Sequence, residues 1–286
     1  MIHVAYYMYF DTHAHVNFSA FAGDGEDVLR RCLASGLGVV NVGSQYSTSR
    51  RAMDYAHKFE KGIWAAVGIH PVHLKKGNFT HRDPEELEEI EIATTGERFE
   101  YGKYLKLAQD EKTVAIGEIG LDYHHFEAED DVEYLKNLQK ETLISFIKLA
   151  NEVDKPVMLH CWDAYEDLLE VLRNNPVNKK GIVHSFIGSY KTANKFIELG
   201  YRIGLNGIIT YGESYDRLLK EIDLQDIVLE TDCPYLTPRP LEKGVRNEPL
   251  FVKEVAQKIA DVKGIDVEEV ARVTTRNAKN ILELSF

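Results

Sequence analysis

The sequence predicts an α/β protein: one domain, residues 1–286, folded as a (β/α)8 barrel of the TIM-barrel class. Three observations support this prediction. Short apolar runs alternate with amphipathic helical patterns along the chain, which is typical of parallel strands joined by helices. Eight such runs can be counted, the number that closes the barrel. The length of 286 residues is close to the ~250 residues typical of this fold.

The predicted strands are short and rich in Val, Ile and Leu, as expected of parallel strands that are buried on both faces. In chain order they are Met8–Asp11, Gly38–Val42, Ile63–Gly68, Thr113–Gly117, Val157–His160, Gly181–His184, Tyr201–Asn206 and Ile227–Glu230.

Helical patterns follow most of these strands, with apolar residues recurring three or four positions apart. The predicted helices are Val28–Ala34, Ser49–Phe59, Leu135–Val153, Tyr165–Arg173, Thr192–Leu199, Tyr215–Ile222 and Pro249–Val262, with two more, Val267–Val273 and Thr275–Leu284, on the outside.

The third unit departs from this pattern, because residues Leu74–Glu111 are long and rich in charge, notably over Pro84–Glu91 and Gly96–Tyr104. One interpretation is an enlarged loop beside the active face, since barrel insertions collect in such loops. The favoured interpretation is a solvated helical excursion without a chemical role.

Composition limits the possible partners. The net charge is −12, with 46 acidic and 34 basic residues. Proteins that bind nucleic acid over a broad surface are usually basic, because phosphate neutralisation supplies much of the affinity. Any contact with nucleic acid is therefore expected to be local and helped by metal ions.

The cysteines and the apolar runs indicate the compartment. Cys32, Cys161 and Cys233 are few and show no paired spacing, which favours a reducing environment. No apolar run approaches the ~20 residues that span a bilayer, and the first residues lack a signal-peptide pattern. We expect a cytoplasmic protein without a membrane partner, and a monomer.

Six residues that can bind metal ions end or directly follow predicted strands. They are His13 and His15 (first strand), Glu118 (fourth), His160 (fifth), His184 (sixth) and Asp232 (eighth). The C-terminal ends of barrel strands meet at one rim, which is where barrel enzymes build their active sites. Scattered structural histidines would not repeatedly select that end, so the sequence predicts a metal site there.

The donor set is larger than one ion requires. His13 and His15 are two residues apart on an extended chain and therefore point the same way, although a lone His-x-His is more often structural. Four imidazoles and two carboxylates exceed the needs of one tetrahedral zinc site and suit two divalent cations. We predict Glu118 as the bridge and Asp232 as both ligand and general base. Helix capping is the structural alternative for both carboxylates, but neither precedes an obvious helix start.

These residues lie in motifs that resemble those of the TatD family of metal-dependent deoxyribonucleases, within the amidohydrolase-like barrels. The motifs follow the family order along the whole chain: Phe10–His15, Gly68–Pro71, Ile116–Tyr123, Lys155–His160, Val183–Phe186, Glu230–Leu236 and Arg246–Pro249. The resemblance implies one metal ion on His13, His15 and Asp232, a second on His160 and His184, and Glu118 shared by both. It also implies exonucleolytic cleavage of phosphodiester bonds in DNA.

Two positions differ from the family pattern. Trp162 stands where the family usually carries an arginine; an indole cannot neutralise a phosphate, but it can stack on a base or ribose. Val72 stands where a histidine is frequent, and His73 follows one residue later. Both differences bear on the substrate rather than on the metal ligands.

Three further residues are candidate substrate contacts. His70 ends the third strand at the same rim, with a buried structural histidine as the alternative. Arg246 and Asn247 are expected to reach back over the mouth to a phosphate, as this segment does in the resembling family, with a plain surface loop as the alternative.

Two pairs of residues receive no chemical role. His124 and His125 are predicted to lie at the rim or in solvent, because adjacent histidines cannot both face the metals. Cys161 and Cys233 each adjoin a proposed ligand, and neighbours on a strand point to opposite faces. We therefore expect both to be buried packing residues.

Three classes of function are compatible with this pattern. The leading hypothesis is a two-metal phosphodiesterase acting on DNA. The alternative is a hydrolase of C–N, ester or lactone bonds in a small molecule; such barrels often bridge their metals with a carboxylated lysine where this chain has Glu118. A non-catalytic metal-binding protein is disfavoured because all six ligands are present. Histidine ligands favour zinc or manganese, while the carboxylate bridge and a phosphate substrate admit magnesium.

Overall fold

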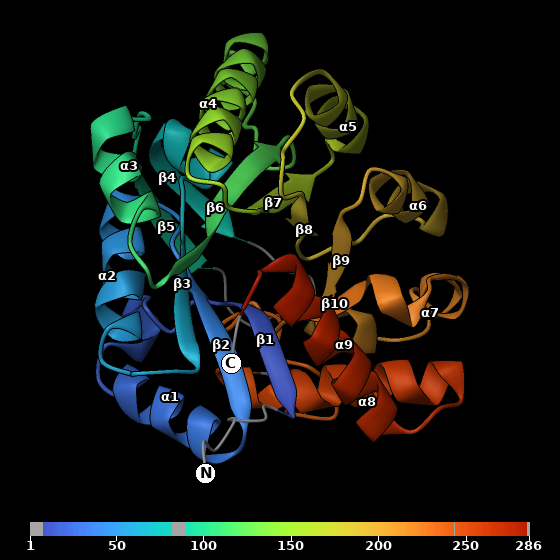
Figure 1. Cartoon of the computed structure of the whole chain (residues 1–286). Helices are drawn as coiled ribbons and strands as arrows, with labels where there is room; N and C mark the ends of the chain where they lie inside the picture. Colours follow the sequence, from blue (N-terminus) through green and yellow to red (C-terminus); the bar gives the residue numbers. More distant parts are fainter. Residues whose placement is uncertain (1–7, 82–89, 243, 285–286) are drawn as a thin grey trace.

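Eight parallel strands form one curved sheet in the computed structural model, which describes residues 8–81, 90–242 and 244–284. The sheet is a nearly closed barrel with helices around it (Figure 1). Its strands, in spatial order, are β1 (Tyr9–Ala14), β2 (Leu37–Val42), β3 (Ile63–Val67), β6 (Thr113–Asp122), β7 (Val157–Trp162), β8 (Gly181–Val183), β9 (Arg202–Leu205) and β10 (Ile227–Leu229). The Thr12 hydroxyl in β1 donates to the Leu229 carbonyl in β10 at 3.0 Å, which joins the first strand to the last. The predicted (β/α)8 fold is confirmed.

The seven helices predicted between strands are all present, with ends shifted by a few residues. The helices are α1 (Gly25–Ala34), α2 (Tyr46–Ala56), α3 (Tyr101–Ala108), α4 (Val132–Glu152), α5 (Tyr165–Asn174), α6 (Tyr190–Glu198), α7 (Asp216–Glu221), α8 (Val252–Lys263) and α9 (Val267–Ile281). Short 3-10 turns are η1 (Ser19–Phe21), η2 (Pro71–Leu74), η3 (Gly207–Thr210), η4 (Leu224–Asp226) and η5 (Pro249–Phe251).

The prediction of two separate outer helices near the C-terminus is wrong, because α9 is continuous. Thr274 stood between the two predicted helices. Its hydroxyl donates to the Val270 carbonyl at 2.8 Å, one turn earlier. A β-branched polar residue is tolerated inside a helix when its hydroxyl bonds back in this way.

Alternate residues of each strand pack in two different places. Val39 belongs to the large apolar cluster between strands and helices, whereas Val40 belongs to a smaller cluster inside the barrel. This alternation follows from the two-residue period of a strand. Ala278 and Leu282 at the end of α9 join the inner cluster. Apolar side chains thus close the N-terminal end of the barrel, and the polar residues lie at the opposite end.

Three strands, β1, β6 and β7, extend beyond their predicted C-terminal ends, and β1 and β6 each contain an irregularity. The pairing register shifts between Asp11 and Ala14 in β1, and between Ile116 and Ile119 in β6. Such bulges re-aim side chains and recur beside active sites. His13 and Glu118 therefore lie within bulged strands rather than after their ends, which corrects the predicted boundaries.

The long third unit is not the helical excursion that we favoured. Strands β4 (Lys76–His81) and β5 (Ile90–Thr95) form an antiparallel hairpin, and within the described part of this unit the α-helix is α3, Tyr101–Ala108. Most of the charged stretch Pro84–Glu91 lies outside the described residues. The alternation of apolar and polar residues in Ile90-Glu91-Ile92 is a strand pattern, which the high charge of the segment obscured. Among the described residues, no helix has the length and apolar character needed to cross a membrane.

Candidate metal centre

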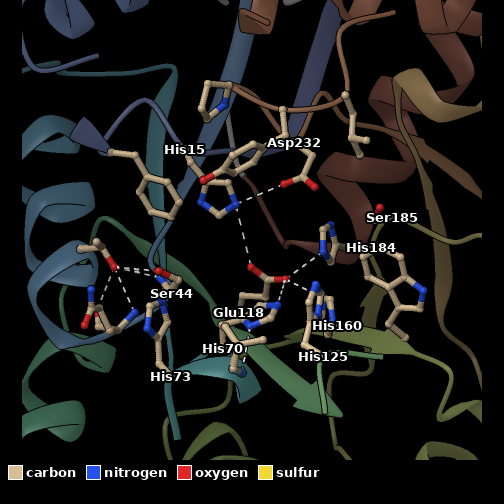
Figure 2. A pocket seen from close by; sticks show the side chains of 18 of the residues that line it. His15, Ser44, His70, His73, Glu118, His125, His160, His184, Ser185 and Asp232 are labelled. Atoms are coloured by element: carbon tan, nitrogen blue, oxygen red, sulfur yellow. Dashed lines mark hydrogen bonds and ion pairs between the residues drawn. The ribbon is translucent and has the colours of Figure 1, made fainter. Parts of the chain in front are cut away.

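A cavity of about 430 Å³ opens at the C-terminal ends of the barrel strands. Five of the six predicted metal ligands line it, and Figure 2 shows them converging from different strands. The sixth, His13, has no exposed surface and lies directly beneath them.

One group of donor atoms surrounds the side chain of His15. Its Nε2 lies 3.2 Å from Nε2 of His13 and 3.2 Å from Oδ1 of Asp232. Oε2 of Glu118 lies 3.5 Å from the His13 Nε2 and 3.9 Å from the His15 Nε2. Two imidazoles and two carboxylates therefore present donor atoms to one small volume.

A second group surrounds the other carboxylate oxygen of Glu118. Oε1 lies 2.9 Å from Nε2 of His184, 3.0 Å from Nδ1 of His160 and 3.5 Å from Nε2 of His70 (Figure 2). Each oxygen of Glu118 thus faces a different set of imidazoles. Grouping by distance alone also places His13, His15 and Asp232 together, and His70, Glu118 and His160 together, as sets that could hold a metal ion.

Backbone geometry explains why these side chains meet. The bulges in β1 and β6 turn His13 and Glu118 into the mouth of the barrel. Asp232 adopts a left-handed backbone conformation, with φ of 56°, which aspartate tolerates better than most residues. Its amide donates to the carbonyl of His13 at 2.8 Å. The first strand and the segment after the last strand are therefore tied together at the site.

Asp122 is a buried residue of the site that sequence reasoning missed. Its Oδ2 lies 3.1 Å from Nε2 of His160 and 2.8 Å from Nδ1 of His125. Its Oδ1 accepts the backbone amides of His124 and His125, each at 3.0 Å. The signal was available, since Asp122 follows Glu118 by four residues and an even spacing on a strand means the same face.

Glu230 is the second missed residue, and it is fully buried. Its Oε1 accepts the Ser185 amide at 2.5 Å and lies 3.4 Å from Nδ1 of His184. His15 is held in a similar way, because its Nδ1 lies 2.8 Å from the Val42 carbonyl. Such partners fix which imidazole nitrogen faces a metal ion.

The electrostatics keep the carboxylates ionised. Burial would raise the pKa of Glu118, but the neighbouring His70, His184 and His13 hold that pKa well below its usual range. Burial is likewise outweighed at Asp232, whose pKa is lowered by a hydrogen bond from His15 and the charge of His184. A buried anion, Glu118, and a partly buried one, Asp232, surrounded by imidazoles, form a donor set that fits divalent cations.

The histidines fall into two electrostatic classes. Burial lowers the pKa of His13 and of His70, with nearby His184 and His160 acting in the same direction. For His160, burial is outweighed by bonds to Asp122 and Glu118, which raise its pKa to about 9. The pKa of His184 is raised by Glu118 and Glu230 despite burial.

Arg246 is not among the residues that line the cavity, so its predicted contact with a phosphate stays a prediction. Its guanidinium donates to both carboxylate oxygens of Asp24, at 2.9 and 2.6 Å, to Glu248 at 2.7 Å and to the Ala20 carbonyl at 2.8 Å. It also packs over the ring of Phe21 at 4.2 Å. Its donors serve the protein's own structure.

Asn247 is also placed differently from the prediction, because it is fully buried. Its amide donates to the carbonyls of Thr231 and Tyr235, at 3.0 and 2.6 Å. These bonds support the loop that carries Asp232, and the predicted substrate contact of Asn247 stays a prediction. His70, by contrast, does lie in the cavity wall.

The wall of the cavity contains an aromatic cluster around Trp162. The ring of His124 stacks on the indole at 4.1 Å and 10°, and His125 meets it edge-on at 5.2 Å. His125 is more than a rim residue, since it bonds Asp122 as well as lining the cavity. Cys161 and Cys233 are both buried.

Comparisons with known proteins agree with this arrangement. The family model described as TatD related DNase matches residues 10–283. The chain belongs to the TatD family. It is thus a metal-dependent hydrolase, with His, Glu and Asp groups that can bind metal ions.

Relatives extend over nearly the full chain. An uncharacterized metal-dependent hydrolase of Bacillus subtilis, YabD, is 36% identical, covering 97% of this chain and 100% of that protein. A protein of Erwinia amylovora named 3'-5' ssDNA/RNA exonuclease TatD is 30% identical, covering 96% and 100%. Among solved structures, the TatD homologue YjjV from Escherichia coli superposes with a TM-score of 0.79 at 27% identity, covering 98% and 99%.

Proposed function

We propose that this TatD-family protein is a two-metal phosphodiesterase that removes nucleotides from one end of single-stranded DNA. One observation carries the proposal: the two oxygens of Glu118 face two separate groups of imidazoles, at 3.5 Å on one side and 2.9 Å on the other. A carboxylate placed in this way suits a pair of ions better than a single ion.

The proposed ligands follow from that geometry. His13, His15 and Asp232 would hold one divalent ion, His160 and His184 the other, and Glu118 both. Bound there, the ions would lower the pKa of a water and clamp the oxygens of the phosphate. Zinc, manganese and magnesium all remain candidates for these positions.

The two carboxylates receive different roles because their exposure differs. The side chain of Glu118 is 4% exposed, which suits a bridge enclosed by ligands. The side chain of Asp232 is 16% exposed. Asp232 can therefore reach the cavity and accept the proton of the attacking water, as a general base must. Its lowered pKa keeps it ionised.

His70 would orient the phosphate as a neutral donor. The amide of Val72 donates to its Nδ1 at 3.2 Å, so the ring proton lies on Nε2, the atom that faces Glu118 and the cavity. The lowered pKa of His70 keeps the ring uncharged. A neutral imidazole in this state donates one hydrogen bond at a fixed position.

The rest of the cavity supports an end of a strand rather than a long duplex. Its wall is largely apolar, with Val72, Trp162 and Ile208 among the lining residues, and the protein is strongly acidic overall. Trp162 can stack on a base or ribose. Relatives that are named exonucleases acting on single-stranded DNA and RNA favour the same substrate class.

The apolar wall also favours the alternative, a hydrolase of C–N, ester or lactone bonds in a small molecule, because such pockets bind compact apolar groups.

We further propose that the chain acts as a single-domain monomer and that it is cytoplasmic.

The test uses purified protein loaded with Mg²⁺, Mn²⁺ or Zn²⁺. It should hydrolyse bis-p-nitrophenyl phosphate and shorten end-labelled single-stranded DNA one nucleotide at a time. Glu118→Ala should abolish both activities while keeping the far-ultraviolet circular dichroism spectrum. Glu129→Ala, which changes an exposed carboxylate, is the matched control. Turnover of lactones or amides alone would overturn the proposal in favour of the alternative.

A further inference from the structure

The cavity extends beyond the metal ligands toward the start of α2, where Ser44, Arg51 and His73 line it. Figure 2 shows Ser44 and His73 on the side of the cavity away from His184. His70 connects the two regions: its Nε2 is 3.5 Å from Glu118 Oε1, its amide donates to the Ser44 carbonyl at 2.8 Å, and its ring centroid is 6.5 Å from that of His73. This region is therefore separated from the candidate metal centre by one side chain.

Arg51 gives this region its charge. Among the residues that the structure describes, it is the only lysine or arginine in the cavity lining. It is exposed, and it makes no hydrogen bond or ion pair within the described ranges. Arg246, in contrast, uses its guanidinium on Asp24 and Glu248. Arg51 is therefore the side chain that brings a permanent positive charge to this part of the cavity.

The neighbouring groups are neutral donors. His73 is 5% exposed, and its Nδ1 has no hydrogen-bond partner within the described part of the chain. Burial lowers the pKa of His73 to about 4, so the ring is uncharged at neutral pH. Within the residues that the structure describes, the Ser44 hydroxyl has one long contact of 3.4 Å, to Thr48 Oγ1.

The acidic group bonded to the start of α2 faces away from the cavity. Glu97 accepts the amide of Tyr46 at 3.1 Å and the Tyr104 hydroxyl at 2.6 Å, and it is absent from the lining. The first amide of α2 is therefore already satisfied. Any anion in this part of the cavity would contact side chains and not the end of the helix.

We propose that Arg51, His73 and Ser44 bind the phosphodiester next to the one that is cleaved. The inference rests on the proposed phosphodiesterase function and adds a second substrate position to it. One guanidinium matches the single charge of a phosphodiester and can bind it through two parallel hydrogen bonds. The preferred substrate is then a strand with at least two consecutive phosphates, one at the metals and one at Arg51.

The test compares thymidine trinucleotides that differ only in the linkage beside the scissile bond. In one series both linkages are phosphates; in the other, one linkage is an uncharged methylphosphonate, placed in turn at each position. For the wild-type enzyme, loss of the charge at the correct position should lower kcat/KM roughly tenfold, the scale of a charged hydrogen bond. In Arg51→Gln, replacing the phosphate by a methylphosphonate should hardly change kcat/KM, because the guanidinium that binds the phosphate charge is absent.

Two variants complete the design. Arg50→Gln removes the same charge from the preceding, exposed position of α2, which is outside the cavity lining, and should keep the tenfold discrimination. Arg51→Lys should restore part of it, because lysine keeps the charge but not the paired donors. Arg51→Gln should also reduce the slope of log kcat/KM against log salt concentration by about one for the all-phosphate trinucleotide.

The outcomes separate this inference from the proposed function. If Arg51→Gln discriminates between charged and uncharged linkages as strongly as the wild type does, the inference is wrong while the phosphodiesterase proposal stands. The same holds if the wild type does not discriminate at the linkage beside the scissile bond. If the wild-type protein cleaves neither the trinucleotides nor bis-p-nitrophenyl phosphate, the proposed function is wrong and the inference falls with it.

Discussion

Asp122 lies 3.1 Å from Nε2 of His160, and this contact leaves Nδ1 of the same ring turned toward Glu118 at 3.0 Å. The carboxylate therefore decides which nitrogen of His160 is available to a metal ion. Partners of this kind commonly change metal affinity by 10–100-fold when they are removed.

Asp122→Asn should lower the affinity for one of the two proposed metal ions by roughly that factor. The affinity for the other ion should stay nearly unchanged. Titration calorimetry with Mn²⁺ or Zn²⁺ should resolve two classes of site, of which one shifts. Asp163→Asn is a suitable control, because the exposed carboxylate of Asp163 contacts the ring of His124, and neither residue lines the cavity. An equal loss of affinity for both ions would argue against the assignment of His160 to one of them.

Metal loading should stabilise the folded protein, because Glu118 and Asp232 are ionised carboxylates enclosed by the barrel. A ligand that binds only the native state at 100 times its Kd adds about 2.7 kcal/mol, and ~1 kcal/mol raises Tm by about 2–4 °C at this chain length. Differential scanning fluorimetry should therefore show a rise of several degrees on adding metal, and its reversal by chelator. The rise should be much smaller in Glu118→Ala; an undiminished rise would place the ions elsewhere.

His73 should make stability depend on pH. Burial lowers its folded-state pKa to about 4, whereas an unfolded histidine titrates near 6.5. Between these values the unfolded chain binds more protons, so stability rises with pH. The contribution, about 3 kcal/mol, is present above pH 6.5 and is lost as the pH falls to 4.

Urea denaturation at several pH values can isolate this contribution. His73→Gln should flatten the dependence between pH 4 and 6.5 relative to the wild type. His57→Gln, at a side chain that is 44% exposed, should leave it largely intact. Parallel curves for wild type and His73→Gln would refute the explanation.

Arg246→Gln should lower stability and leave substrate binding unchanged. The substitution removes bonds to Asp24, Glu248 and the Ala20 carbonyl, in partly solvated surroundings. We expect a loss of about 1–2 kcal/mol in the free energy of unfolding and no change in KM for oligonucleotides. The exposed pair Arg217–Glu221 provides the comparison. Arg217→Gln should lower the free energy of unfolding by less than about 0.5 kcal/mol. A raised KM with normal stability would restore the phosphate role predicted from the sequence.

The fold and the position of the site were predictable because both depend on short-range patterns. Eight apolar runs marked the strands, and polar residues at their ends marked the rim. The residues His13, Glu118 and Asp232 meet because parallel strands of a barrel all end on one side. This rule needs no knowledge of side-chain contacts.

Features that depend on competition between contacts could not be predicted. The bond between Arg246 and Asp24 joins residues 222 positions apart, a contact that no short-range pattern indicates. The hairpin β4–β5 was hidden by its charge, although Ile90-Glu91-Ile92 carries the alternation of a strand. Asp122 was overlooked because the apolar run that marked its strand stopped at Gly117, whereas β6 continues to Asp122.

The hydrogen bond between Thr12 and Leu229 closes a ring whose two ends are 217 residues apart in the chain. During synthesis, His13 and His15 leave the ribosome long before Asp232 exists. A short nascent chain therefore cannot assemble the ligand group that these three residues form. Until the last strand arrives, β1 presents an unpaired edge that can recruit the wrong strand. Contacts of such long range also slow folding. The protein should therefore become able to bind metal ions late and in a single step, when the barrel closes.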